Sequence, residues 1–187
     1  HLLTASARRA MAMYDDHHEA SLLCVERLLE IHPDEPRFLL SKAGLLSRTA
    51  DTETHRGFLR EVTEKPDADP IFAQQLAEAL IGDARCWGEA EQLVRRARRA
   101  YGSSDPSILS IEAWLLEEQQ RHVEAQSIRR FEACLAARSE GANWNFFETS
   151  RVAGRTDEAM ALLERRIERH GAQSSARPCS SMAIPSS

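Results

Sequence analysis

The sequence predicts an all-α protein, an α-solenoid of about five antiparallel helix-turn-helix hairpins. The first observation is a recurring Glu-Ala pair near the start of four expected helices, with its alanine at Ala20, Ala90, Ala125 and Ala159. These alanines are 70, 35 and 34 residues apart, and a fixed period of this length is typical of stacked helical hairpins. The second observation is composition: only 6% of the 187 residues are aromatic, whereas the helix-forming residues Ala, Leu, Arg and Glu are abundant.

The first hairpin is expected over residues 1–33. Apolar residues at helical spacing predict one helix over residues 1–14 and a second over about residues 17–32. The inward face expected of the second helix is Ala20, Leu23, Cys24, Leu28 and Ile31. Pro33 ends this helix, because proline has no backbone N–H to donate and restricts the residue before it.

The second hairpin, expected over residues 36–66, departs from the repeating pattern. Its second helix has Thr54-His55 at the place where the recurring alanine should stand. A small side chain at that place normally lets two paired helices approach closely near their turn. We therefore expect this hairpin to be degenerate.

Three further hairpins are expected over residues 70–102, 105–139 and 141–171. The inward face of the third repeats at helical spacing and comprises Ala90, Leu93, Val94, Ala97 and Tyr101. The inward residues expected in the fourth and fifth are Ala125, Ile128, Phe131 and Leu135, then Ala159, Leu162, Leu163 and Ile167. Residues 172–187 are either a Ser/Pro-rich tail or the start of a truncated sixth repeat.

Together these features resemble the tetratricopeptide repeat family over roughly residues 2–171. The small residue early in that family's second helix is matched by Ala90, Ala125, Ala159 and, in the first hairpin, Ala20 or Ser21. The family's first-helix pattern of a large residue followed by small ones is matched best by Leu40, Ala43 and Gly44. The second hairpin lacks its alanine, and most first-helix aromatics of the family are replaced. The resemblance implies a right-handed superhelix whose first helices line a concave groove.

The resemblance further implies a scaffold that binds a protein or peptide partner in this groove. The expected groove residues are Ser41, Leu45, Arg48, Gln75, Ala79, Ser110, Trp114, Glu117, Trp144, Glu148 and Arg151. Trp114 and Trp144 either anchor the partner or fill the interface between hairpins, since aromatic side chains serve both purposes. Lys42 is not followed by an asparagine at the matching place, so the carboxylate clamp of some family members is not expected.

Arginines of the expected second helices offer a different surface. The residues concerned are Arg95, Arg96, Arg98, Arg99, Arg129, Arg130, Arg165, Arg166 and Arg169. They either form a basic stripe for an acidic partner or RNA, or are solvated and paired with glutamates such as Glu91, Glu132 and Glu164. The formal net charge of −5 disfavours nucleic acid as the partner.

No catalytic, cofactor or metal site is expected. The sequence has no Gly-rich phosphate loop, no Gly-x-Ser-x-Gly and no His-x-x-x-His, and its four cysteines include no Cys-x-x-Cys pair. No apolar run approaches the roughly 20 residues that span a bilayer, so we expect a cytoplasmic protein with no membrane partner. Two alternatives remain open: an accessory segment of a larger transferase or peptidase that positions substrate or mediates dimerisation, and a homo-oligomer or larger complex formed through exposed ends of the stack.

Overall fold

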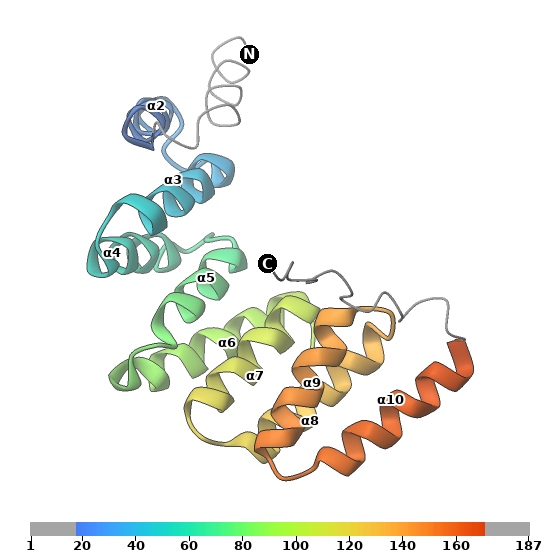
Figure 1. Ribbon diagram of the computed structural model, residues 1–187. Helices are drawn as coiled ribbons and strands as arrows, with labels where there is room; N and C mark the ends of the chain where they lie inside the picture. Colours follow the sequence, from blue (N-terminus) through green and yellow to red (C-terminus); the bar gives the residue numbers. More distant parts are fainter. Residues whose placement is uncertain (1–17, 171–187) are drawn as a thin grey trace, which may run out of the picture. The chain divides into compact units, whose positions relative to one another are not determined.

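The computed structural model describes residues 18–170, in which helices are joined by short turns. It contains nine α-helices and one short 3-10 helix, with no strand in the described range (Figure 1). The predicted all-α class is therefore confirmed. The helix expected over residues 1–14 and the segment 172–187 lie outside the described residues.

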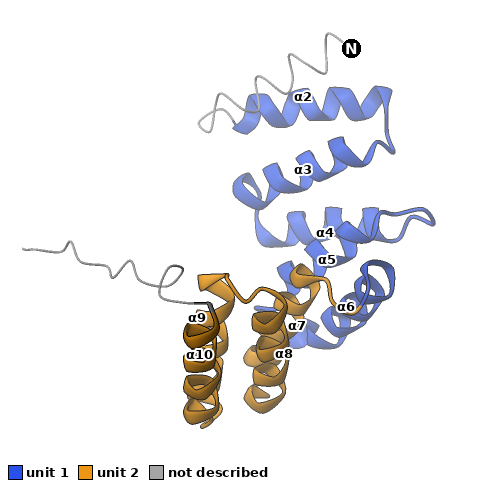
Figure 2. Ribbon diagram, turned by 90° about the vertical axis from the view of Figure 1, so that its right-hand side faces the viewer, with its two compact units in different colours: residues 1–102 blue, residues 103–187 orange. Residues whose placement is uncertain are grey.

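The chain divides into two compact units, residues 1–102 and 103–187, which are described separately (Figure 2). The first unit contains α2 (His18–Ile31), α3 (Pro36–Thr49), α4 (Thr52–Thr63), α5 (Pro70–Leu80), the 3-10 turn Ala84–Cys86 and α6 (Trp87–Tyr101). The second unit contains α7 (Pro106–Glu118), α8 (His122–Leu135), α9 (Glu140–Val152) and α10 (Thr156–His170). Within each unit, every helix packs against the next helix along the chain.

An Asp-Pro pair starts the first helix of two hairpins. The Asp69 carboxylate accepts a hydrogen bond of 3.0 Å from the backbone N–H of Ile71 at the start of α5. Asp105 does the same at α7, with 2.9 Å to the N–H of Ser107. A proline follows each aspartate, in the first turn, where the missing backbone N–H costs nothing. These caps explain why the helices begin where the sequence changes from polar to apolar.

The hairpins of the second unit share one turn geometry. Gly154, between α9 and α10, has a φ of 72°, and Gln120, at the matching place between α7 and α8, has a φ of 61°. In both turns the next residue donates a backbone hydrogen bond across the turn, from Arg155 to Ser150 at 2.7 Å and from Arg121 to Leu116 at 2.8 Å. Glycine adopts this left-handed conformation without strain, whereas glutamine does not.

The recurring alanines are packing positions. Ala90, Ala125 and Ala159 are completely buried, each in the first half of its helix. In α2 the equivalent buried residue is Ser21, while Ala20 is exposed, which settles the choice between them. A small side chain at these places lets neighbouring helices approach without a void. The other inward residues expected in α6, Leu93, Val94 and Ala97, are also buried.

Two expected inward faces were only partly right: Leu28 in α2 and Ala125 in α8 are buried as expected, and other members are not. In α2, Leu23, Cys24 and Ile31 are exposed, and the buried residues are Ser21, Val25 and Leu28. The expectation was phased on Ala20 instead of Ser21, and one residue turns a helix by about 100°. In α8, Phe131 and Leu135 are exposed, and the buried residues are Ala125, Gln126, Arg129, Glu132 and Ala133. Tyr101 and Ile167, expected inside, are exposed as well.

Candidate partner-binding surfaces

The expected groove residues fall into two sets, one in each unit. In the first unit Ser41, Leu45 and Arg48 are on α3, and Gln75 and Ala79 are on α5. In the second unit α7 carries Ser110, Trp114 and Glu117, and α9 carries Trp144, Glu148 and Arg151. Leu45 is buried, so it belongs to the core instead of an open surface.

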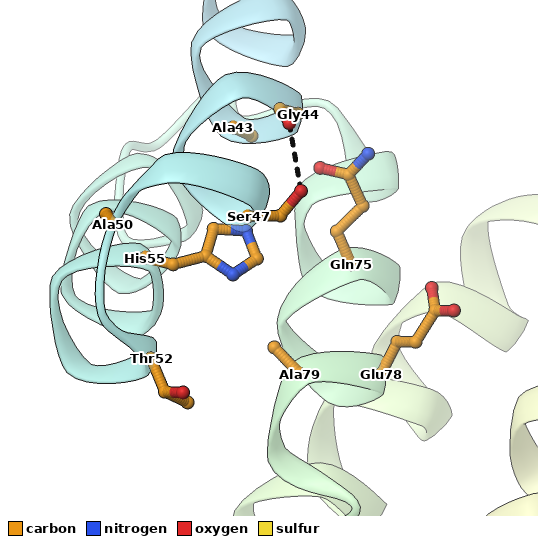
Figure 3. Close-up of a pocket in the computed structure, with 9 residues that line it drawn as sticks. All are labelled: Ala43, Gly44, Ser47, Ala50, Thr52, His55, Gln75, Glu78 and Ala79. Carbon is orange, nitrogen blue, oxygen red and sulfur yellow. Dashed lines mark hydrogen bonds between the residues drawn. The ribbon is translucent and has the colours of Figure 1, made fainter. Parts of the chain in front are cut away.

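A hollow of about 350 Å³ lies between α3, α4 and α5 in the first unit (Figure 3). We call it the α3–α5 hollow, and its lining residues are Ala43, Gly44, Ser47, Ala50, Thr52, His55, Gln75, Glu78 and Ala79. Two of the expected groove residues, Gln75 and Ala79, are among them. Ser41 and Arg48 are not part of this lining.

His55 stands where the other second helices have a small residue, and its ring projects into the space between α3 and α5 (Figure 3). The missing alanine of the second hairpin is therefore accompanied by an opening between its helices. Burial lowers the pKa of the His55 imidazole, and the neighbouring Arg56 guanidinium lowers it further. A lowered pKa keeps the ring neutral at physiological pH.

Arg56 ties α4 to the end of α5 beside this hollow, an interaction that sequence reasoning did not anticipate. Its Nε donates to the backbone oxygen of Ala79 at 2.9 Å, and its Nη1 lies 3.1 Å from the Glu53 carboxylate. The same Nη1 is 3.6 Å from Asp83. The pKa of Asp83 is strongly lowered, first by hydrogen bonds from Arg85 and also by the charges of Arg85 and Arg56.

Two polar side chains of the α3–α5 hollow lack partners. The Gln75 Oε1 atom is buried and accepts no hydrogen bond, and Figure 3 shows it turned toward α3. Glu78, one turn further along α5, makes no hydrogen bond or ion pair with any residue in the described range. Glu78 is exposed to solvent, whereas the Gln75 Oε1 atom has no exposed surface.

In the second unit, the two tryptophans are on the surface. Trp144 is 63% exposed and Trp114 is 39% exposed, so neither fills the interior of the hairpins. The Trp114 Nε1 donates to Glu118 of the same helix at 3.2 Å. The Trp144 ring lies beside Phe147, with 6.1 Å between ring centroids, and Phe147 packs on the core cluster of this unit.

A second hollow, of about 280 Å³, opens between α7, α8 and α9. We call it the α7–α9 hollow, and its lining residues are Glu117, His122, Arg129, Asn145, Glu148, Thr149 and Val152. Glu117 and Glu148 were both expected in the groove. Arg151, on the same helix as Glu148, donates to its carboxylate at 2.9 Å and 3.1 Å.

The floor of the α7–α9 hollow is a buried ion network centred on Arg129, which is only 6% exposed. The Arg129 guanidinium donates two bonds to Glu117, at 3.1 and 3.2 Å, and one to Glu132 at 3.0 Å. It also reaches the Ser110 hydroxyl at 3.0 Å. Burial alone would lower the pKa of Arg129, but the hydrogen bonds and charges of Glu117 and Glu132 outweigh it and raise the pKa.

One interpretation placed Arg129 in an exposed basic stripe, but its side chain is buried and cannot contribute to such a surface. Several other arginines of that set have partners in their own unit: Arg95 pairs with Glu91 at 3.4 Å, and Arg96 donates to the Thr63 backbone oxygen at 3.0 Å. Arg166 donates to Asn143 and Cys134. The exposed members of the set are Arg95, Arg96, Arg99, Arg130, Arg165 and Arg169, divided between the two units.

Within residues 18–170, no three His, Cys, Asp or Glu side chains gather closely enough to hold a metal ion. The same residues include no helix with the length and apolar character needed to cross a membrane.

The hairpins, buried alanines and turn geometry define a tetratricopeptide-repeat-like helical-repeat protein. No family model and no curated protein matches the sequence. Solved structures do match: "MamA 41-end" from Desulfovibrio magneticus RS-1 is 10% identical, with a TM-score of 0.73 over 93% of this chain and 96% of that one. Another MamA crystal structure is 11% identical, with a TM-score of 0.71 over 98% and 97% of the two chains.

A tetratricopeptide repeat protein from Parabacteroides merdae ATCC 43184 is 17% identical, with a TM-score of 0.66 over 90% of this chain and 62% of that one. At such identities the likeness shows the fold alone. It confirms the predicted α-solenoid class and the resemblance to tetratricopeptide repeats.

Proposed function

We propose that the chain is a non-catalytic scaffold that binds a peptide or a partner domain through the first helices of its hairpins. The exposure of Trp144 carries this proposal. At 63%, it is the most exposed large hydrophobic side chain of the described residues. Tryptophan is one of the residues enriched among the anchors of protein–protein contacts, because its indole ring buries a large area.

The surroundings of Trp144 support this role. Trp144, Glu148 and Val152 are four residues apart on α9, so they lie on one face of the helix. Glu148 and Val152 line the α7–α9 hollow, and Val152 is itself an exposed hydrophobic residue. A partner that covers the Trp144 indole can therefore continue along α9 into the hollow.

The floor of the hollow is already formed before any partner arrives. Glu117 accepts hydrogen bonds from Arg129 and from the Thr149 hydroxyl, so these three residues hold one another in place from three different helices. A preformed surface loses little conformational entropy on binding, which favours affinity for a given contact area. Because the charged groups on the floor of the α7–α9 hollow already pair with one another, shape and apolar contact are the main determinants of recognition there.

The test is selection of random peptides on the complete chain, followed by titration of the enriched peptides. Trp144→Ala should weaken binding by about tenfold or more, as loss of a central aromatic anchor does. The matched control is Phe131→Ala, which removes an aromatic side chain that is 44% exposed on a second helix of the same unit. Failure to enrich any peptide, or equal losses in the two variants, would refute the assignment of this surface.

A further inference from the structure

We propose that one flank of α10 binds an amphipathic helix of a partner protein, and that basic side chains border the apolar stripe of that helix. The flank consists of Met160, Leu163 and Ile167, and none of these residues lines the α7–α9 hollow. The surface is therefore a second docking site, separate from the one proposed above. α10 packs on α9, and it is the last helix of the described residues (Figure 1).

The equivalent flank of α8 is covered by the following helix. The residues of α8 that stand 34 positions before Met160, Leu163 and Ile167 are Gln126, Arg129 and Ala133. All three are buried. The helix that covers this flank is α9, since Ala133 belongs to the same core cluster as Phe146 of α9.

The same three places are covered in α4 of the first unit. Counted from His55, which takes the place of the recurring alanine, they are Arg56, Leu59 and Thr63, and all three are buried. Arg56 donates a hydrogen bond to the backbone oxygen of Ala79 on the following helix, α5. This flank of a second helix is therefore the surface on which the next helix of the stack packs.

In α10 these places are apolar and uncovered. Met160 is 44% exposed and Ile167 is 52% exposed, whereas their counterparts in α8 are buried. Leu163 is partly buried. The three residues are at positions i, i+3 and i+7, so they form one stripe along the helix. An apolar stripe at a place where other hairpins hold a helix indicates that a helix docks there.

Carboxylates border this stripe along one edge. The residues concerned, Asp157, Glu164 and Glu168, are all exposed. Glu164 lies four residues after Met160 and three before Ile167, so it is next to both on the helix surface. Among residues 18–170, no cation lies within ion-pair distance of these three carboxylates.

The exposed arginines of α10 are on the other side of the helix. At about 100° per residue, Arg165 and Arg169 lie about 140° and 180° around the axis from Met160. Arg166 is turned inward, where it donates a hydrogen bond to Asn143. The charge beside the apolar stripe is therefore negative, and a helix with lysine or arginine beside its own apolar stripe complements it.

This charge pattern favours a partner helix over two other occupants. A second copy of the chain, paired antiparallel through the same flank, would bring two acidic edges together. Residues 171–187, which follow α10 in the sequence, carry a single charged side chain, Arg177, and so do not match three carboxylates. From Asp157 to Glu168 the flank extends about 16 Å, so a partner helix of three turns covers it.

The test uses the complete chain and two synthetic peptides of about fourteen residues, each held helical by a hydrocarbon staple because short helices are unstable in isolation. Both peptides carry leucine at the a and d positions of a heptad, and one has lysine and the other glutamate beside that stripe. Fluorescence anisotropy of the labelled peptides should show that the lysine peptide binds. The glutamate peptide should bind about tenfold more weakly or worse.

Two changes to the chain locate the binding. Ile167→Ser should weaken binding of the lysine peptide about tenfold, as expected for the loss of one buried aliphatic side chain. The matched control, Leu135→Ser, changes an apolar residue of α8 that is 48% exposed and should leave binding unchanged. Glu164→Lys combined with Glu168→Lys should reverse the preference, so that the glutamate peptide binds more tightly than the lysine peptide.

Three results would overturn the inference. The first is no binding of the lysine peptide, or equal losses in Ile167→Ser and Leu135→Ser. The second is a wild-type dimer that Ile167→Ser dissociates in sedimentation velocity, which assigns the flank to a second copy. The third is a larger loss of thermal stability in Ile167→Ser than in Leu135→Ser, which means that the chain's own residues cover the flank. None of these results affects the role of Trp144, which the selected peptides test separately.

Discussion

The Thr149 hydroxyl donates a hydrogen bond of 2.6 Å to Glu117 Oε1, the oxygen that also accepts from Arg129 Nε. Thr149 is on α9 and Glu117 is on α7, 32 residues earlier in the chain. One carboxylate thus joins the first helices of two successive hairpins and the second helix between them. Five polar residues of this unit are connected in one hydrogen-bonded network: Ser110, Glu117, Arg129, Glu132 and Thr149.

Replacing Arg129 by methionine should strongly destabilise the second unit. The change keeps much of the side-chain volume but leaves the Glu117 and Glu132 carboxylates without their cation. Removing one partner of a buried ion pair costs about 3 kcal/mol or more. Urea unfolding followed by circular dichroism measures the loss. Arg130→Met, on the exposed neighbouring residue, should cost less than about 0.5 kcal/mol, and equal losses would contradict the structure.

Two buried threonines should respond oppositely to replacement by valine. Thr149→Val removes the donor to Glu117 and should cost about 2 kcal/mol, as for a hydrogen bond to a charged group. Thr63 is also buried, but its hydroxyl has no partner, so Thr63→Val should be neutral or stabilising. Urea midpoints of the two variants make the comparison directly, and a stabilising Thr149→Val would be incompatible with the network.

Gln120→Gly should stabilise the chain by about 0.5–1 kcal/mol, because glycine adopts a positive φ without the steric cost borne by glutamine. The reciprocal change, Gly154→Gln, places a side chain at the matching turn and should destabilise by about 1 kcal/mol. Thermal unfolding of both variants tests the pair. A change in stability of the same sign in both variants would show that the two turns are not equivalent.

Stability should depend on the protonation of His55. Its pKa is lowered in the folded chain, so the unfolded chain binds a proton more readily. The contribution of neutral His55 to the free energy of unfolding is fully present above the pKa of the unfolded state, about 6.5. It is lost as the pH falls from there through the lower pKa of the folded state. Urea unfolding at several pH values should show this slope in wild type and in His32→Ala, but a reduced slope in His55→Ala.

The repeat architecture could be predicted because packing in a helical hairpin is local and periodic. The buried residues Ala90, Ala125 and Ala159 occupy the same packing position in three helices. Their regular spacing can be found in the sequence without knowing which distant residues are in contact. The buried face of α2 was assigned incorrectly because the small buried residue of this helix is Ser21, and the exposed residue before it is an alanine. Hydrophobicity alone favours Ala20 there.

The Arg129 network was beyond such reasoning. An arginine is normally exposed, and the burial of Arg129 is explained by its partners Glu117 and Ser110 on α7, which are 12 and 19 residues away in sequence, together with Glu132 on its own helix. The α3–α5 hollow, in contrast, left a sequence signal, since Thr54-His55 interrupts the series of small residues. What the sequence did not show is that the interruption opens a space lined by Gln75 and Glu78.

If the chain binds a peptide as we propose, His55 also bears on the register of that peptide. Similar repeats offer an extended peptide several nearly equivalent places to bind, one period apart. Ala90, Ala125, Ala159 and Ser21 make their own helix starts alike, whereas His55 makes the start of α4 different. A peptide that contacts His55 would lose that contact by sliding one repeat in either direction. An irregular repeat thereby gives direction and position to an otherwise repetitive surface.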